Sequence, residues 1–297
     1  MDLMNKLVVD GVILAYRIDG TRGGPPVVLL HGVTGSHRTY DEVVHDLDPA
    51  FEIHRLDFRG HGESSRAPGT YDIDHLVADV VTYLRTVVGR PAFLAGHSLG
   101  GVVTHCVAQR YPDLVVAAFE EDPPLFFCDH SLFEQSPFAF VFPMLAEATR
   151  AMQSDCLPTE AAFRAVANTP TARGGIASEV MTDIAIAGRA DEMLRVDVTV
   201  FDGVIDGTML QGYNPLDPVT VPLTILAADP ALGAALAPEH VTALSAAHPS
   251  ASLIEIDRAT HLIHTETPTY TTYLAHLRNA IATAFADADG QPLERRR

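Results

Sequence analysis

Uninterrupted apolar runs that end near a glycine most strongly limit how this chain can fold. VVLLHG at residues 27–32 is such a run, and PAFLAG at residues 91–96 has the same form. Runs of this kind are typical of strands that are buried on both faces of a parallel sheet. Parallel strands need a crossover between them, which is usually helical. The two runs therefore predict alternating strands and helices.

The residues around these runs follow that alternation. Residues 72–88 and 99–111 have the apolar spacing of helices, and residues 51–60 and 114–122 indicate further strands. Asp10-Gly11 marks a hairpin turn between two shorter apolar runs near the start of the chain. The pattern predicts an α/β fold with a mostly parallel sheet and helices on both faces.

The alternation stops in the middle of the chain. Residues 123–217 contain helical stretches but no convincing buried strand, and the strand pattern resumes with PLTILAAD. We therefore predict a helical cap at 123–217, inserted into a core formed by 1–122 and 218–290. Residues 291–297 are expected to form a flexible polar tail.

Composition excludes several classes of partner. The formal net charge is −18 over 297 residues, so nucleic acid and an acidic membrane surface would be repelled. The histidines and three cysteines lack the spacing of metal or redox motifs, so we expect no metal and no cofactor. Without a signal peptide or an apolar run near the ~18 residues of a membrane span, we expect a cytoplasmic protein. A homodimer is one candidate assembly.

The stretch GHSLGG contains the first candidate catalytic residue, Ser98. Its neighbours Gly96 and Gly100 suit a crowded turn from a buried strand into a helix. Such a turn lifts the serine hydroxyl above the carboxyl edge of the sheet, where α/β folds bind ligands. The helix N-terminus that follows favours developing negative charge. This context predicts that Ser98 is a nucleophile.

Four motifs occur in a characteristic order. They are HGVTGS at 31–36, DFRGHGES at 57–64, GHSLGG at 96–101 and ATHLIHTETP at 259–268. With these motifs the chain resembles the α/β-hydrolase superfamily, and in particular serine hydrolases with a helical cap. The resemblance covers almost the whole chain, and it is much less specific about substrate than about family.

A serine nucleophile needs a base and an oxyanion hole. The superfamily keeps its base in the loop after the last strand, which implies His261, with His264 packing nearby. The residue after the nucleophile supplies one amide donor, here Leu99. The resemblance implies Val33 as the second donor, and we interpret His31 as a structural residue of that loop.

Two aspartates compete to orient His261. Asp229 ends the strand near which most α/β hydrolases carry their acid. Asp122 ends the strand after the nucleophile helix, where a subset carries it, including the lactone hydrolases that open zearalenone. We favour Asp122 as the triad acid and keep Asp229 as the alternative.

The cap contains six of the chain's thirteen phenylalanines within residues 126–142. Most are expected to form the core of the cap and its seal against the main domain, yet they also predict an apolar pocket that tolerates aromatic groups. Candidate substrate-binding residues are Gly32, Phe126 and Phe127.

The predicted function is hydrolysis of an apolar carboxylic ester or lactone through an acyl-enzyme. A lactonase of the zearalenone-hydrolase type is the sharper hypothesis. A carbon–carbon bond hydrolase of ring-cleavage products is the first alternative. The second is a small-molecule receptor that binds without turnover.

Overall fold

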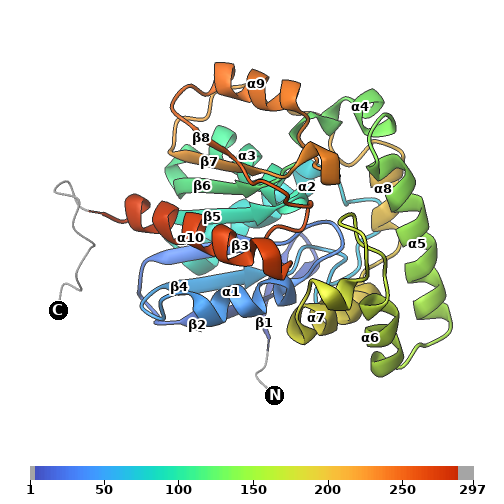
Figure 1. Cartoon of the computed structure of the whole chain (residues 1–297). Helices are drawn as coiled ribbons and strands as arrows, with labels where there is room; N and C mark the ends of the chain where they lie inside the picture. The colour runs from blue at the N-terminus through green and yellow to red at the C-terminus, as the bar shows by residue number, and fades with distance from the viewer. Residues whose placement is uncertain (1–3, 287–297) are drawn as a thin grey trace.

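An eight-stranded sheet forms the centre of the described chain, which comprises residues 4–286 of the computed structural model (Figure 1). The strand order is β1-β2-β4-β3-β5-β6-β7-β8, and the strands from β3 to β8 run parallel to one another. The antiparallel hairpin of β1 and β2 adds to the β4 edge. The strands are β1 (Asn5–Val9), β2 (Val12–Gly20), β3 (Pro26–Leu30), β4 (Glu52–Leu56), β5 (Ala92–His97), β6 (Val115–Glu121), β7 (Leu223–Ala227) and β8 (Ser252–Glu255).

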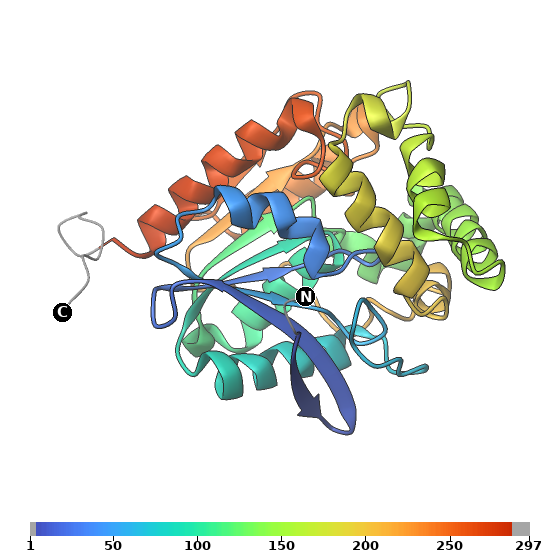
Figure 2. The same cartoon turned by 90° about the horizontal axis from the view of Figure 1, so that it is seen from below.

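Helices cover both faces of the sheet (Figure 2). Residues of α2, α3 and α9 share one apolar cluster with the sheet, and residues of α1 and α10 share the other. The helices and short helical turns of these layers are η1 (His37–Tyr40), α1 (Asp41–Asp46), α2 (Ile73–Tyr83), η2 (Leu84–Val88), α3 (Leu99–Arg110), η3 (Pro112–Leu114), η6 (Pro230–Leu232), α9 (Pro238–Ala247) and α10 (Thr267–Ala284). The predicted fold class is confirmed.

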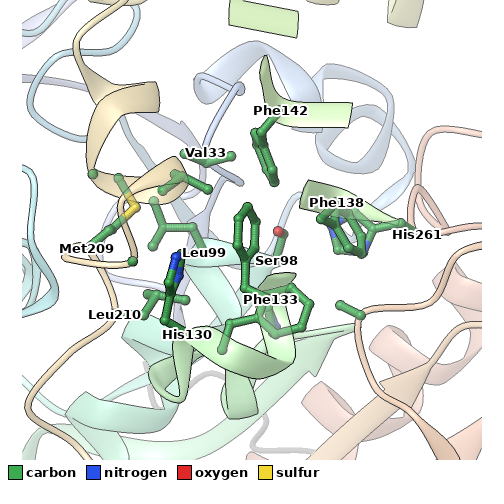
Figure 3. Close-up of a pocket in the computed structure, with 16 residues that line it drawn as sticks. Val33, Ser98, Leu99, His130, Phe133, Phe138, Phe142, Met209, Leu210 and His261 are labelled. Atoms are coloured by element: carbon green, nitrogen blue, oxygen red, sulfur yellow. The ribbon is translucent and has the colours of Figure 1, made fainter. Parts of the chain in front are cut away.

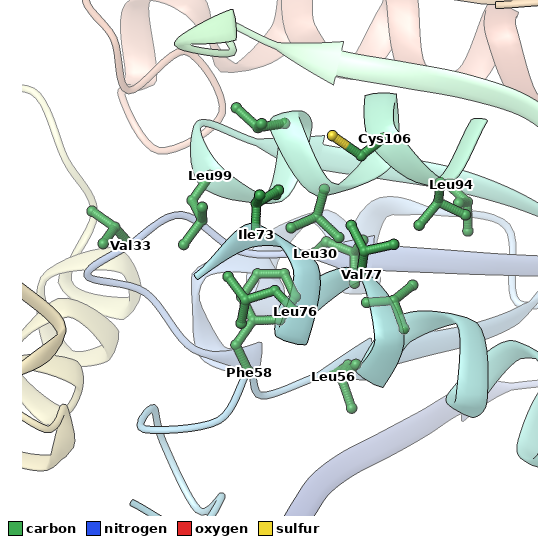
Figure 4. Packing of buried hydrophobic residues seen from close by; sticks show 14 of the residues in the cluster. Leu30, Val33, Leu56, Phe58, Ile73, Leu76, Val77, Leu94, Leu99 and Cys106 are labelled. Atoms are coloured by element: carbon green, nitrogen blue, oxygen red, sulfur yellow. The ribbon is translucent and has the colours of Figure 1, made fainter. Parts of the chain in front are cut away.

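The central strands are apolar throughout because both of their faces are covered. Every residue of β3 and β5 is buried. Leu30 and Leu94 pack with Leu76 of α2 in the cluster shown in Figure 4. Burying such a side chain contributes about 1.5–3 kcal/mol. Val33 and Leu99 belong to the same cluster, so the core anchors both side chains.

A group of helices separates β6 from β7 in the sequence. They are η4 (Leu125–Cys128), α4 (His130–Glu134), α5 (Phe138–Ser154), α6 (Thr159–Ala167), η5 (Ala177–Glu179), α7 (Asp183–Arg195) and α8 (Val200–Ile205). They lie together beyond the ends of the strands, on one side of the sheet (Figure 1). Within the described residues no strand longer than the single bridge of Pro170 and Ile176 occurs in this segment.

The helices of this group have an apolar core of their own. It consists of alanine, valine, isoleucine and methionine side chains from α6, η5, α7 and the residues between them. The phenylalanines are absent from that core, apart from Phe163 at its border. The predicted tail at 291–297 lies outside the described residues. No helix within residues 4–286 has the length and apolar character needed to cross a bilayer.

A buried ion pair fixes the loop after β4. Arg59 Nε and Nη2 donate to the two carboxylate oxygens of Asp79 on α2, at 2.7 and 2.8 Å. Asp79 is fully buried and Arg59 is 3% exposed. Removing one partner of such a pair leaves the other charge buried without compensation.

We therefore expect Asp79→Ala to lower the free energy of unfolding by about 3–5 kcal/mol. Urea titration measures this loss. The matched control is Asp113→Ala at an exposed position, expected within about 0.5 kcal/mol of the parent. Equal stabilities of the two variants would contradict the role of the pair.

Candidate active site

Ser98 lies at the turn from β5 into α3. Its backbone has φ +53° and ψ −118°, a sparsely populated conformation for a residue with a side chain. Glycine is required at both flanking positions because a side chain would not fit there. A Cβ at Gly96 would overlap the carbonyl of Gly100, and one at Gly100 would overlap the carbonyl of Leu30. The GxSxG pattern thus reflects the close approach of strand and helix.

His261 lies in the loop between β8 and α10 and contacts Asp122 at the end of β6. Its Nδ1 lies 2.6 Å from Asp122 Oδ2. The amides of Ala228 and Ala235 also donate to the Asp122 carboxylate, at 3.2 and 2.8 Å. Asp122 is fully buried and adopts φ +40°. A carboxylate held by three donors fixes the imidazole ring and leaves its Nε2 for another partner.

Asp229 does not reach His261. Its carboxylate accepts the Ala231 N–H at 2.9 Å and caps η6, and its own N–H donates to Ala259 O. Of the two predicted acids, the structure therefore brings only Asp122 to the histidine.

The other acidic residues at the end of β6 have different partners. Glu120 contacts His105 of α3 at 3.0 Å, on the face of the sheet that α3 covers. Glu121 accepts both the N–H and the Nδ1–H of His264, at 2.8 and 2.7 Å. Alternation along the strand sends these side chains to opposite faces. His264 thereby ties the loop of His261 to β6, which agrees with its predicted packing role.

Two backbone donors beside Ser98 are unused. Within residues 4–286, neither the Val33 N–H nor the Leu99 N–H donates a hydrogen bond. The carbonyl groups of the Val33 loop, by contrast, accept hydrogen bonds within the protein. Gly32 O accepts from His31 Nδ1 and from the Gly35 N–H, at 2.7 and 2.9 Å. The arrangement leaves amide donors available for a substrate oxygen.

Two histidines hold this loop. Burial lowers the pKa of His31 to about 3, so the ring is neutral, and its Nε2 accepts the Phe58 N–H at 3.0 Å. His61 Nε2 donates to Val33 O at 2.7 Å. The RGHG motif does not show which carbonyl the His61 ring reaches, so the sequence alone does not place His61 at the site. The structural role expected for His31 agrees with these contacts.

Two adjoining cavities open onto Ser98 and His261. The smaller has a volume of about 40 Å³ (Figure 3) and the larger of about 290 Å³. Phe138 and Phe142 of α5 line both cavities, and the Phe138 ring packs edge-on against His261 at 5.0 Å. Phe127 and Phe133 line the smaller one. These phenylalanines face the cavities, and Phe126 and Phe142 pack against the main apolar cluster, so they lie between the cap helices and the core rather than inside the cap.

The three candidate substrate-binding residues have different positions relative to the cavities. Gly32 lines the larger cavity, and a Cβ there would meet His97 Nδ1 at 2.9 Å. Phe127 lines the smaller cavity, as expected. Phe126 lines neither. It stacks on His240 of α9 at 4.2 Å, because the η4 turn directs adjacent side chains apart.

The larger cavity also contains a buried acid. Glu192 of α7 accepts hydrogen bonds from the N–H and Oγ of Ser36, at 3.0 and 3.2 Å. Burial raises the pKa of Glu192 to about 7, although Arg189 acts in the opposite direction. Within residues 4–286, no group of three or more histidine, cysteine or acidic side chains has the geometry of a metal site.

Comparison with known proteins agrees with the fold. Residues 27–271 match the model of the alpha/beta hydrolase family. The chain therefore belongs to this family.

Similar proteins cover several activities. The chain is 33% identical over 113 residues to 2-(acetamidomethylene)succinate hydrolase of Mesorhizobium japonicum. The aligned residues make up 38% of this chain and 40% of that protein. The chain is 32% identical over 123 residues to the human serine hydrolase-like protein, 41% of this chain and 61% of the relative. These matches span less than two thirds of either relative. The solved enol-lactonase of Burkholderia xenovorans has a TM-score of 0.64 at 20% identity, covering 93% of this chain and 99% of that one.

The contact of Asp122 with His261 predicts the outcome of replacing each candidate acid. Asp122→Asn should lower kcat for a chromogenic ester by about four orders of magnitude, because the amide favours the wrong tautomer of His261. Asp229→Asn is the control and should change kcat by less than about twofold, because Asp229 contacts only its own turn. A large loss in the second variant alone would contradict the assignment.

The raised pKa of Glu192 predicts a pH dependence of stability. Between pH 4.5 and about 7 the folded state keeps a proton that the unfolded state releases, so stability is lost as the pH rises through this window. Relative to Glu192→Gln, the parent should lose up to about 3 kcal/mol of unfolding free energy. Urea titrations of both proteins at several pH values measure this difference, and parallel curves would contradict it.

Proposed function

We propose that this protein is a serine hydrolase that cleaves a carboxylic ester or lactone through an acyl-enzyme. One observation carries the proposal. His261, held by the buried Asp122, lines the same cavities as Ser98, and two unused backbone amides flank the serine. A nucleophile, an oriented base and oxyanion donors are the groups that acyl transfer requires.

Each residue has a role in the proposed reaction. His261 Nε2 takes the proton of the Ser98 hydroxyl as its oxygen attacks the substrate carbonyl. The amides of Val33 and Leu99 stabilise the oxyanion, and one such donor contributes about 3–4 kcal/mol. The tetrahedral intermediate collapses when protonated His261 gives the proton to the leaving alkoxide. Asp122 stabilises the imidazolium throughout.

The second half of the reaction uses the same groups. Water enters, His261 takes its proton, and the resulting tetrahedral intermediate releases the acid and restores Ser98. The apolar walls of Phe138 and Phe142 limit the water that reaches the acyl-enzyme.

We propose further that the ester bond cleaved is that of a lactone. An enol-lactonase is among the similar structures, which supports ring opening as one reaction of this fold. The position of Asp122 directly after β6, as in the zearalenone-type hydrolases that the sequence resembles, favours a macrocyclic lactone. The apolar cavity of about 290 Å³ next to Ser98 favours a substrate with an apolar body.

Turnover of para-nitrophenyl esters tests the acyl-enzyme. The parent should release a burst of about one equivalent of para-nitrophenol before the steady state. Ser98→Ala should lose the burst and at least about four orders of magnitude in kcat. Ser250→Ala, at an exposed turn, is the matched control and should behave as the parent.

Binding of esters without turnover by the parent would contradict the proposal and favour a receptor. Turnover that survives Ser98→Ala would contradict the role of the serine. A zearalenone ring-opening assay addresses the macrolactone separately, because its failure leaves ester hydrolysis unaffected.

A further inference from the structure

Among the described residues, the arginine that lines the larger cavity has no acidic side chain paired with it. Arg189 of α7 lines the cavity that Ser98 and His261 also line. Across the described part of the chain, its guanidinium makes no hydrogen bond, and no carboxylate oxygen lies within 4.0 Å of it. A charged side chain inside a cavity is normally paired, because leaving it unpaired costs free energy.

Glu192 and Glu266 line the same cavity as Arg189, but each has another partner. Glu266 binds Arg173, with Arg173 Nε 2.5 Å from Glu266 Oε2. Glu192 accepts two hydrogen bonds from Ser36. Both carboxylates act on Arg189 only through longer-range attraction. The guanidinium therefore keeps its five N–H donors for a molecule that enters the cavity.

Arg189 also lies near the reacting groups. Arg189, His97 and His261 line the same cavity. Burial lowers the pKa of His97 well below its usual value, and the charges of His261, His264 and, to a smaller extent, Arg189 act in the same direction. His97 directly precedes Ser98 and donates from Nε2 to His261 O at 2.9 Å. A group bound to Arg189 would thus belong to the molecule whose carbonyl faces Ser98.

The remaining walls of the cavity restrict the chemistry of that molecule. Apolar side chains from the cap helices and neighbouring loops predominate, namely those of Phe138, Val141, Phe142, Leu145, Val166, Met181 and Ala185. One guanidinium matches one carboxylate in two parallel hydrogen bonds. A phosphate dianion would keep a second charge uncompensated in an apolar cavity. A carboxylate therefore fits better.

We infer that Arg189 binds a free carboxylate of the substrate, so that the protein acts on an ester or lactone with an apolar body and one anionic end. This inference rests on the proposed function, because it places the scissile carbonyl at Ser98. The formal charge of −18 repels anions from the surface as a whole. Arg189 supplies the local attraction that such a substrate requires.

The test compares substrates that differ only in the charge of one end. Para-nitrophenyl half-esters of succinic, adipic and suberic acid carry a free carboxylate at increasing distance from the ester. Their methyl diesters are neutral and have nearly the same length. The parent should show a higher kcat/KM for at least one half-ester than for its methyl diester.

Arg189→Gln should lower that half-ester to diester ratio by about 10- to 100-fold, the effect expected for a hydrogen bond to a charged group. Arg189→Lys keeps the charge and should retain part of the preference. Arg164→Gln is the matched control, because Arg164 is an exposed cap residue paired with Glu160. A ratio unchanged by Arg189→Gln, or no preference in the parent for any half-ester, would overturn the inference.

Binding separates this inference from the proposed function. In Ser98→Ala protein, calorimetry compares the monomethyl and dimethyl esters of the same acids, with and without Arg189→Gln. A preference for the anion that depends on Arg189, without turnover in the parent, supports the arginine site and rejects the hydrolase. Turnover in the parent without that preference rejects the arginine site alone.

Discussion

The strand-to-helix turn at Ser98 is the constraint on which the rest of the site depends. Gly96, Gly100 and the carbonyl of Leu30 pack so closely that no side chain fits at either glycine. This contact holds Ser98 in a strained backbone conformation, which costs about 1–3 kcal/mol. The packing of the buried strands on both sides offsets this cost. The same turn leaves the Leu99 amide free at the start of α3.

The neighbouring strands place the other groups around this turn. Parallel strands all end at one edge of the sheet, so the loops after β3, β5, β6 and β8 converge there. In the Val33 loop, His31 and His61 donate to the carbonyls of Gly32 and Val33, and within residues 4–286 the Val33 amide donates no hydrogen bond. Asp122 and His261 come from loops 139 positions apart in sequence, and their hydrogen bond spans the loops after β6 and β8.

Much of this arrangement could be predicted from the sequence, because local signals carry it. The apolar runs of β3 and β5 identify the sheet, and GHSLGG identifies the turn. Two other features depend on tertiary contacts without a local signal. The sequence left Asp122 and Asp229 as alternatives, because both follow buried strands and only their distance to His261 separates them. It also could not show that Phe126 turns away from the cavity that Phe127 lines.

The proposed function requires Ser98 to be a nucleophile that His261 activates. A serine-directed phosphonate tests this requirement, because the reagent forms a bond only with an activated hydroxyl. Peptide mass spectrometry after incubation should find one adduct, on the peptide that contains Ser98, and none in His261→Ala protein. Absence of an adduct in the parent, or an adduct on another serine, would contradict the claim.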